Sequence, residues 1–253
     1  MAKKYGLPYQ GSKSKLAERI VALLPPATHL YDVFAGGCAI THAALLSGKF
    51  KEVHANDISD SVTLFEDALN GKYENESRWI SREDFFRLKD SDPYVRIVWS
   101  FGNNQRDYMY SRDLEPKKLS AHVAYFKNGV TPNIRLQHLE RRRRLDDIKA
   151  TFGDCDIKLE INCSSYSEVD IKEGGVIYCD IPYEKTNNRY KLNSVFCYEK
   201  FYEWACSQTL PVYVSSYQMP NSDFEEVLAI DFVQRLSSNG SSKVTEKLFV
   251  AKK

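Results

Sequence analysis

The sequence has no long apolar run, no paired cysteine motif and no marked excess of charge. Without about 20 consecutive apolar residues it predicts no membrane-spanning helix. The first five residues lack the apolar core of a signal peptide, so we expect a cytoplasmic protein. The six cysteines, at positions 38, 155, 163, 179, 197 and 206, form no C-x-x-C pair, which favours reduced thiols over a disulfide frame or a zinc site. The five histidines show no metal-ligand spacing, so no metal is expected.

Charge is almost balanced, because 35 Lys and Arg residues face 34 Asp and Glu residues and leave a formal net charge of +1. A protein that bound polyanions through its overall charge would need a large basic excess. Any surface for nucleic acid must therefore arise from local charge asymmetry. With 253 residues, the chain is long enough for one sizeable α/β domain that carries an insert.

The most informative segment is the tetrapeptide Asp180-Ile181-Pro182-Tyr183, which follows the apolar run 176–179. The run predicts a buried strand that ends at the aspartate. Pro182 cannot donate to a ladder, so the Asp180 carboxylate and the Ile181 carbonyl are both left as acceptors for an exocyclic amine. Tyr183 offers a face on which a flat heterocycle can stack. An isolated string of this kind is more often a plain strand and turn, so its meaning depends on the other motifs.

A second motif is the run 30–39, a short strand that enters a glycine pair before a helix-like segment, 40–46. Strand, glycine turn and helix in this order are typical of a nucleotide-type cofactor loop. A further strand, 52–56, ends at Asp57, where an acid can hold ribose hydroxyls. The match to G-x-G-x-x-G is poor, since only Gly36 and Gly37 are present, and a purely structural glycine turn is the alternative.

A third block, Tyr9-Gln10-Gly11-Ser12-Lys13, precedes a predicted helix. In this helix Leu16, Ile20, Leu23 and Leu24 recur at helical spacing before Pro25-Pro26. A glycine, a hydroxyl and a lysine before a helix could close over a ligand. Alone, the block is ordinary N-terminal loop chemistry.

Together the motifs resemble those of the Dam-like, alpha-ordered DNA adenine methyltransferases, which use S-adenosyl-L-methionine. That family has Y/W-x-G-G/S-K near its start, then F-x-G-x-G/S, N/A-D-I, a target-recognition insert and D-P-P-Y. In this chain those places hold the block 9–13, the loop 34–38, Asn56-Asp57-Ile58 and the tetrapeptide 180–183; the segment 236–243 is similar to the family's late S-S-N-G hairpin. The departures are Cys38, where glycine or serine is usual, and Ile181, where proline is commoner.

The resemblance implies roles for particular residues. Tyr9 and Lys13 are expected near the carboxylate end of the cofactor, the loop from Phe34 to Gly37 along its body, and Asp57 at its ribose. Tyr166, just before the catalytic strand, is a candidate for the cofactor adenine. The full cofactor-contact set is Tyr9, Gln10, Gly11, Ser12, Lys13, Asp32, Phe34, Ala35, Gly36, Gly37, Cys38, Ala39, Asp57, Ile58, Tyr166 and Asp180. The catalytic set is Asp180, Ile181, Pro182 and Tyr183.

The expected fold is α/β: a Rossmann-like methyltransferase sheet with a terminal antiparallel hairpin and a helical insert. Strand and helix patterns alternate in 1–77 and 153–253, which we assign to the catalytic domain. Between 78 and 152 the strand pattern disappears, which indicates a target-recognition insert. Helices are expected at 82–89, 93–101 and 133–150. Strands are expected at 156–161, 175–180, 211–215 and 247–250, with Asn239-Gly240 as a turn before the last.

DNA contacts are expected in two parts of the insert. The loop 100–110 carries Asn103, Asn104, Gln105, Arg106 and Tyr108, and amides and arginine pair with adenine and guanine edges in the major groove. A hydrogen-bonded surface turn is the alternative. The run 141–144 covers one helical turn, so at least one arginine must lie near the core. We predict phosphate contact by Arg141, Arg142 and Arg144, with a solvated, acid-paired helix as the equal alternative.

The resemblance thus implies methyl transfer to the 6-amino group of an adenine flipped out of DNA. Transfer to the 4-amino group of cytosine is the nearest alternative, although cytosine enzymes of this kind more often carry serine at the place of Asp180. A catalytically inactive relative that only binds DNA is another, and a protein-glutamine or RNA methyltransferase would lack the N-terminal block together with the insert. DNA is the expected partner of a monomer or weak dimer, and the sequence leaves open a cognate restriction nuclease.

Overall fold

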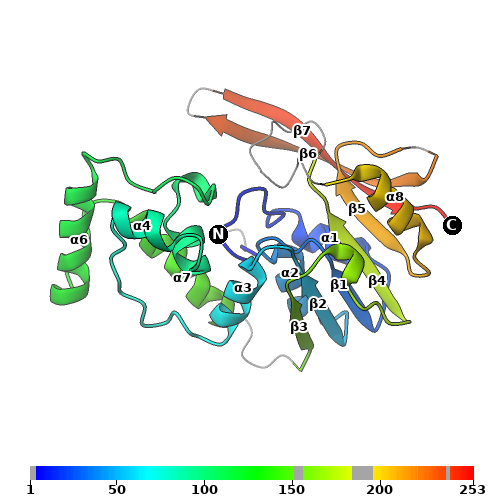
Figure 1. Cartoon of the computed structure of the whole chain (residues 1–253), viewed down its shortest axis with the longest axis horizontal. Helices are drawn as coiled ribbons and strands as arrows, with labels where there is room; N and C mark the ends of the chain where they lie inside the picture. Colours follow the sequence, from blue (N-terminus) through cyan, green and yellow to red (C-terminus); the bar gives the residue numbers. More distant parts are fainter. Residues whose placement is uncertain (1–3, 151–155, 184–195, 221, 238–239) are drawn as a thin grey trace.

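The computed structural model describes residues 4–150, 156–183, 196–220, 222–237 and 240–253. Figure 1 shows a sheet on one side of the molecule and a group of helices on the other, with a long hairpin projecting over the region between them. The seven strands have the order β3-β2-β1-β4-β5-β7-β6. They are β1 (His29–Asp32), β2 (Glu52–Asn56), β3 (Lys158–Asn162), β4 (Gly175–Asp180), β5 (Val212–Ser216), β6 (Phe224–Ser237) and β7 (Gly240–Ala251).

The first five strands are parallel, and β7 lies antiparallel between β5 and β6. Chain order therefore runs outward from β1 through β2 to β3, and then outward in the other direction through β4 and β5. The reversal makes the boundary between β1 and β4 a topological switch point, and ligands bind outside the carboxyl ends of the strands at such a point. Those ends are Asp32 in β1 and Asp180 in β4.

Helices cover both faces of the sheet. Those that accompany the strands are α1 (Ala17–Leu23), α2 (Ala39–Ser47), α3 (Ser61–Leu69) and α8 (Tyr198–Ser207), with a short 3-10 turn, η2 (Tyr166–Glu168). Alternating side chains of β4 divide between two apolar cores: Val176 and Tyr178 pack with helices α1 to α3, whereas Ile177 and Cys179 pack with α8. This alternation is the period of two that a strand imposes, and it explains why β4 is apolar throughout.

The insert consists of α4 (Arg82–Leu88), α5 (Pro93–Val98), η1 (Phe101–Asn103), α6 (Glu115–Asn128) and α7 (Gln137–Ala150), grouped away from the sheet in Figure 1. Local sequence sets its helix starts. The Ser81 hydroxyl accepts from the Asp84 amide at the start of α4, and the Asp92 carboxylate accepts from the Tyr94 and Val95 amides at the start of α5. Such caps satisfy amides that have no partner within the helix.

The predicted α/β fold, parallel sheet and terminal antiparallel hairpin are confirmed. The predicted elements at 52–56 and 175–180 have the observed bounds, the predicted strand 247–250 is the end of the much longer β7, and the others differ by a few residues at their ends. Among the described elements, α6, α8, β6 and the short 3-10 turns η1 and η2 were not predicted. The hairpin partner of β7 is β6, although β5 also pairs with β7. Positions 238 and 239, with the predicted turn at Asn239, lie outside the described residues. None of the described helices has both the length and the hydropathy to cross a membrane.

Candidate functional site

The N-terminal block lies directly on the glycine turn that follows β1. The Leu7 amide donates to the Gly37 carbonyl at 2.7 Å, and the Gly6 amide donates to His42 Nδ1 at 3.0 Å. A β-carbon on Gly37 would lie 2.5 Å from the β-carbon of Tyr9, so only glycine permits this approach. The structure therefore brings together the second and third sequence motifs, as predicted.

The third motif meets the first through Lys13. Its ammonium group lies 2.7 Å from Asp180 Oδ1 and 3.6 Å from Glu246 Oε1. Lys13 is 8% exposed and Glu246 5%, so this is a buried cluster of one cation and two carboxylates. Lys13 thus lies beside Asp180, and its expected contact with the carboxylate end of the cofactor stays a prediction. Glu246, in β7, was not predicted, because only the long-range packing of β7 brings it to Lys13.

Burial and charge act in opposite directions on this cluster. Burial raises the pKa of Asp180, while the ammonium of Lys13 lowers it, and the net result is above the ordinary value. The pKa of Glu246 is also raised by burial and partly restored by Lys13. Burial alone would lower the pKa of Lys13, but its two carboxylate neighbours raise it. Lys13 therefore remains charged and favours ionised partners.

Tyr183 belongs to the same cluster, and its predicted stacking on a base stays a prediction. Its hydroxyl donates to Glu246, its ring lies 4.9 Å from the Lys13 ammonium, and the Tyr217 ring centroid lies 4.3 Å from its own. The Tyr198 hydroxyl of α8 donates to the Pro182 carbonyl at 2.9 Å and so fixes the turn. The parallel ladder ends at the pair of Asp180 and Ser215, which leaves Ile181 beyond the register of the sheet.

Two further acids lie at the same edge of the sheet. Asp32 is 1% exposed, and its Oδ2 accepts from the Thr41 amide at 3.1 Å and from the Thr41 hydroxyl at 2.7 Å. Its Oδ1 is buried and has no hydrogen-bond partner among the described residues. Burial raises the pKa of Asp32 to about 7, and the charges of Asp180 and Asp57 add to the shift. Three carboxylates thus interact across the ends of β1, β2 and β4.

Asp57 is held in place by backbone amides. Oδ2 accepts from the Gly36 amide at 2.8 Å and Oδ1 from the Ser59 amide at 2.9 Å. Next to it, Ile58 exposes 62% of its surface, which is unusual for an isoleucine. Asp57 is thus joined to the glycine turn, and its expected contact with the ribose of the cofactor stays a prediction.

The remaining predicted cofactor residues are arranged around this turn. Phe34 and Tyr166 stack on each other at 5.2 Å between centroids, and the edge of Trp204 lies 5.0 Å from Tyr166. Part of the Tyr166 surface is therefore committed to its aromatic neighbours. Cys38 has a left-handed φ of 57° immediately before α2, where the family's glycine would be unstrained. Ala35, Cys38 and Ala39 are buried, Gln10 and Ser12 are half-buried, and Gly11 is exposed.

The predicted DNA-reading loop is closed at its base, where the Phe101 amide donates to the Asp107 carbonyl at 2.6 Å and the Met109 amide to the Trp99 carbonyl at 2.9 Å. Within the loop, the side-chain Oδ1 of Asn104 accepts hydrogen bonds from the backbone amides of Arg106 and Asp107. Gln105 accepts from Arg96 Nε at 3.2 Å. The side-chain amides of Asn104 and Gln105 thus stabilise the loop itself, which was the alternative to their predicted contact with bases.

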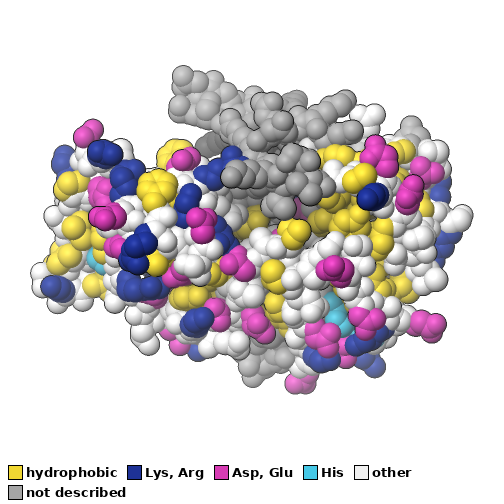
Figure 2. Space-filling model, in the orientation of Figure 1, with side chains coloured by type: hydrophobic (Ala, Val, Ile, Leu, Met, Phe, Trp, Pro, Cys, Tyr) yellow, Lys and Arg dark blue, Asp and Glu magenta, His cyan; other side chains and the backbone are white. Residues whose placement is uncertain are grey.

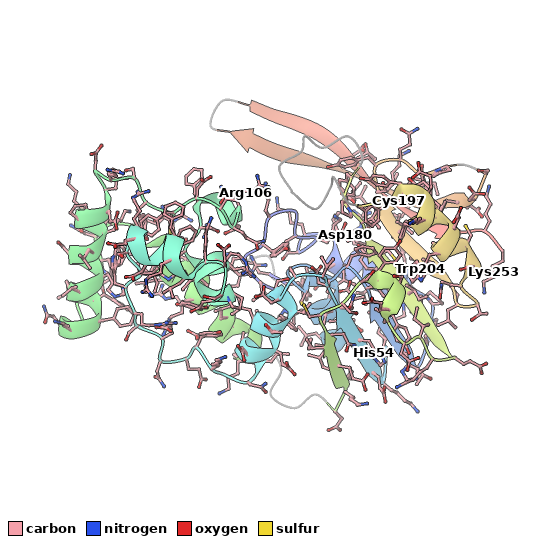
Figure 3. The ribbon with its side chains drawn as sticks, in the orientation of Figure 1. His54, Arg106, Asp180, Cys197, Trp204 and Lys253 are labelled. Atoms are coloured by element: carbon pink, nitrogen blue, oxygen red, sulfur yellow. The ribbon has the colours of Figure 1, made fainter. Side chains whose placement is uncertain are left out.

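Three other residues of this loop, Tyr108, Arg106 and Phe101, differ in their exposure to solvent. Tyr108 is 4% exposed and its hydroxyl donates to the Ile80 carbonyl at 2.8 Å, so it belongs to the core of the insert, and the structure does not support its predicted role in DNA contact. Arg106 is exposed and lies on the side of the insert nearer the sheet (Figure 3). Phe101, which sequence analysis did not single out, is 63% exposed. Arg106 and Phe101 are thus the surface features of this loop.

Three of the four consecutive arginines of α7 donate hydrogen bonds to other parts of the protein. Arg141 donates to the Val98 carbonyl at 2.9 Å and to the Ser100 carbonyl at 2.6 Å. Arg142 donates to the Glu74 carbonyl at 2.8 Å and to Asp146 at 3.1 Å. Arg144 donates to the Gly6 carbonyl at 2.8 Å and to the Tyr5 carbonyl at 2.6 Å. Burial lowers the pKa of both Arg141 and Arg144 to about 10. Their guanidinium groups favour a structural role over the predicted phosphate contact, and only Arg143 of this run is exposed.

We compared the chain with protein families and with solved structures, and it matches one family model and resembles several solved structures. The model of the D12 class N6 adenine-specific DNA methyltransferases matches residues 9–248. Among solved structures, the chain is similar to a provisionally assigned methylase from Haemophilus influenzae, at 11% identity and a TM-score of 0.37, covering 98% of this chain and 92% of that one. It is also similar to a provisionally assigned RNA methyltransferase from Pyrococcus horikoshii (12%, TM-score 0.40, coverage 95% and 82%) and to an rRNA methylase from Streptococcus thermophilus (12%, TM-score 0.33, coverage 100% and 98%). No curated protein matches it.

The four consecutive arginines allow a matched test of their role. Replacing Arg144 with Met should lower the free energy of unfolding by roughly 2 to 4 kcal/mol, because two hydrogen bonds from a charged donor to buried carbonyls are lost. The same change at the exposed Arg143 should leave it within about 0.5 kcal/mol. Urea unfolding measures both. An Arg144→Met protein as stable as the wild type but weakened in DNA binding would contradict the structural role.

Proposed function

The chain belongs to the D12 class N6 adenine-specific DNA methyltransferase family, and from that premise we propose that methyl transfer takes place at the cluster of Asp180, Tyr183, Lys13 and Glu246. The protein is an S-adenosylmethionine-dependent enzyme that methylates adenine in DNA. The observation that carries the proposal is the buried contact of Lys13 with Asp180 at the carboxyl end of β4, next to the glycine turn of β1. This is the position that an open α/β sheet offers to a ligand.

Asp180 and Ile181 would act on the target amine. The lone pair of an aromatic amine is delocalised into its ring, which makes the nitrogen a poor nucleophile. A carboxylate and a carbonyl that accept the two amine hydrogens favour a pyramidal nitrogen with a directed lone pair. The interaction strengthens as positive charge develops on nitrogen, so it stabilises the transition state more than the bound substrate. The position of Ile181 beyond the end of the ladder supports this role for its carbonyl.

Tyr183 would hold the extruded base. The amino group of a paired adenine is inside the duplex, so the base must leave the stack, at a cost of a few kcal/mol that a pocket can partly offset. An aromatic face beside the acceptors supplies stacking. The hydroxyl contact of Tyr183 with Glu246 and the neighbouring Tyr217 fix the orientation of this ring.

Lys13 and Glu246 would set the ionisation of Asp180. Only an ionised carboxylate is purely an acceptor, and burial opposes ionisation at this position. The ammonium of Lys13 offsets part of that cost. Glu246 adds negative charge beside it, so the cluster as a whole attracts the cationic character that develops on the amine.

The cofactor would bind along the acidic edge formed by Asp32, Asp57 and Asp180. When bound, S-adenosyl-L-methionine supplies an electrophilic methyl group on a sulfonium centre. Its sulfonium and ammonium groups outweigh its one carboxylate, so a net positive ligand complements an edge where three carboxylates interact. The buried Asp32 Oδ1 without a partner and the close approach at Gly37 fit such a ligand. Gly36, Asp57 and Ile58 would contact its ribose and base.

The insert would present DNA to this site. We retain 78–152 as the recognition part and 1–77 with 153–253 as the catalytic part; the boundary near 152 lies outside the described residues. Lys and Arg side chains gather over the insert on the face shown in Figure 2. Arg106 and Asn103 are the residues proposed for base edges, and the exposed Phe101 suits insertion between bases. Cytoplasmic location, a cognate restriction nuclease and a monomeric or weakly dimeric state remain predictions of the sequence.

Removing the charge of Asp180 tests whether this residue acts mainly in methyl transfer or mainly in cofactor binding. Asp180→Asn should lower kcat at least about 100-fold, because the lost acceptor acts on the amine, and should weaken cofactor binding much less, because Asp32 and Asp57 keep the acidic edge. Tritium transfer from labelled S-adenosyl-L-methionine to unmethylated DNA measures kcat, and calorimetry measures affinity. Glu226→Gln, a surface acid paired with Lys247, is the control. Full activity in Asp180→Asn would end the proposal, and methyl found on cytosine would favour the alternative substrate.

Cofactor affinity should depend on pH through Asp32. Because burial raises its pKa to about 7, Asp32 is mostly neutral below that pH and mostly charged above it. The charged form attracts a cation, so affinity for S-adenosyl-L-methionine should rise as pH increases through about 7. Asp32→Asn keeps an acceptor for Thr41 and should remove this dependence.

S-adenosyl-L-homocysteine, which lacks the sulfonium charge, is the matched control ligand. Its affinity should vary less with pH, as measured by calorimetry at several pH values. Equal pH dependence for the two ligands, or for wild type and Asp32→Asn, would be inconsistent with this assignment.

Arg106 should contribute to sequence reading. Arg106→Ala should weaken binding to the cognate site by about 1 to 3 kcal/mol if the arginine contacts a base edge, with a smaller loss on unrelated DNA. Arg112→Ala, an exposed arginine elsewhere in the insert, is the control. Fluorescence anisotropy with cognate and with unrelated DNA measures the two affinities and so their ratio. Equal losses on cognate and unrelated DNA would reassign Arg106 to phosphate contact.

A further inference from the structure

A second group of polar side chains lies on one face of the sheet, toward the end opposite the catalytic cluster. His29 and Glu52 are cross-strand neighbours at the first positions of β1 and β2, and His54 follows two residues later on the same face. Figure 3 places His54 toward the far end of the strands from Asp180. In Figure 2, histidine atoms reach the surface among acidic and basic side chains.

The three side chains converge on a point. His29 Nδ1 lies 3.2 Å from His54 Nε2 and 3.4 Å from Glu52 Oε2, and the last two atoms are 3.6 Å apart. A tetrahedral zinc site has metal–ligand distances of about 2.0 to 2.2 Å, which place its ligand atoms about 3.3 to 3.6 Å from one another. The three measured separations therefore agree with one triangular face of a zinc tetrahedron, almost without movement.

The surroundings of His54 favour a ligand role. Its Nδ1 lies 2.8 Å from Glu160 Oε2, so the Nδ1 proton is donated to that carboxylate and the Nε2 lone pair points toward His29 and Glu52. A carboxylate behind a histidine is the usual second partner of a zinc-bound imidazole, because it fixes the tautomer. Tyr31 stacks on His54 at 4.4 Å with an interplanar angle of 14° and holds the ring.

A hydrogen-bonded chain from His29 through His54 to Glu160 would explain these histidines without a metal. It does not explain Glu52, whose Oε2 is buried and has no hydrogen-bond partner among the described residues. A buried carboxylate oxygen without a donor is costly. Lys158 lies 3.7 Å from it, beyond hydrogen-bond distance, and is paired with Glu160. A cation between the two imidazoles and Glu52 would satisfy this oxygen.

We propose that His29, Glu52 and His54 form a zinc-binding site, with a water molecule as the fourth ligand and Glu160 as the positioning residue behind His54. Two imidazole nitrogens and one carboxylate oxygen are a ligand set that suits Zn²⁺. Side-chain exposures of 14% for His29, 26% for Glu52 and 4% for His54 leave the site open on one side. A bound ion would link β1 to β2 and, through Glu160, to β3.

Lys158 gives the site a feature that can be tested. Its ammonium is close enough to Glu52 to compete with a metal ion, and its side chain is 56% exposed, so it can turn away into solvent. Removing this charge should therefore strengthen metal binding, whereas removing a ligand should weaken it. A simple structural role for the histidines predicts neither effect.

The experiment is calorimetric titration of untagged, full-length protein with zinc chloride, after its thiols are blocked with iodoacetamide. Blocking is needed because Cys163, Cys197 and Cys206 are exposed and would bind zinc themselves. We expect one equivalent to bind. His29→Gln and Glu52→Gln should each lower affinity at least about 100-fold, Glu160→Gln about 10- to 100-fold, and Lys158→Met should raise it several-fold.

His122→Gln is the matched control, because His122 Nδ1 and His138 Nε2 form another close pair, 3.0 Å apart, without a carboxylate. Its zinc affinity should equal that of the wild type. Cobalt chloride provides an independent readout, since a tetrahedral site gives intense visible absorption that His29→Gln should lose. No zinc bound by wild type, or equal binding by wild type, His29→Gln and Glu52→Gln, would overturn the proposal.

Discussion

The buried ion pair of Lys13 with Asp180 is the contact on which the rest of the site depends. It joins the N-terminal segment to the end of β4, across 167 positions of the chain. Losing one partner of such a pair costs about 3 to 5 kcal/mol, because the other charge remains buried. The pair can form only because the N-terminal segment lies on Gly37, where a side chain would collide with Tyr9. A backbone contact thus determines where the catalytic charge is located.

The arrangement of charge follows from the sheet. Parallel strands place their carboxyl ends along one edge, and β1, β2 and β4 each end in or immediately before an aspartate: Asp32, Asp57 and Asp180. Lys13 offsets one of these charges and is shared with Glu246. Burial raises the pKa of all three carboxyls, and charge repulsion from neighbouring carboxylates adds to the shift at Asp32 and Asp180, so the edge holds an excess of buried negative charge. A cationic ligand relieves that excess, so the same constraint that is unfavourable for folding favours cofactor binding.

Sequence reasoning found the motifs because they are local. The glycine turn, Asp57 and the tetrapeptide at 180–183 each sit at the end of a strand that its own apolar pattern predicts. Helix α6 was missed because two of its buried positions, Lys118 and His122, are polar and give no apolar stripe. The arginines of α7 were assigned to phosphate because a basic run looks alike whether it faces solvent or carbonyls. What binds them, the carbonyls of Gly6 and Val98, is distant in sequence. Glu246 depends equally on long-range packing.

The cluster of His29, Glu52 and His54 also could not be predicted from the sequence. His29 and His54 are 25 positions apart, so no spacing rule joins them, and the sequence predicted no metal. Parallel pairing of β1 with β2 makes His29 the neighbour of Glu52 and Tyr31 the neighbour of His54. The same register that pairs Asp32 with Ala55 near the cofactor edge therefore places His29, Glu52 and His54 together one to three residues earlier in these strands. Because both sites share these two short strands, a cation that fixed the register at one end would also fix the spacing of the acids at the other.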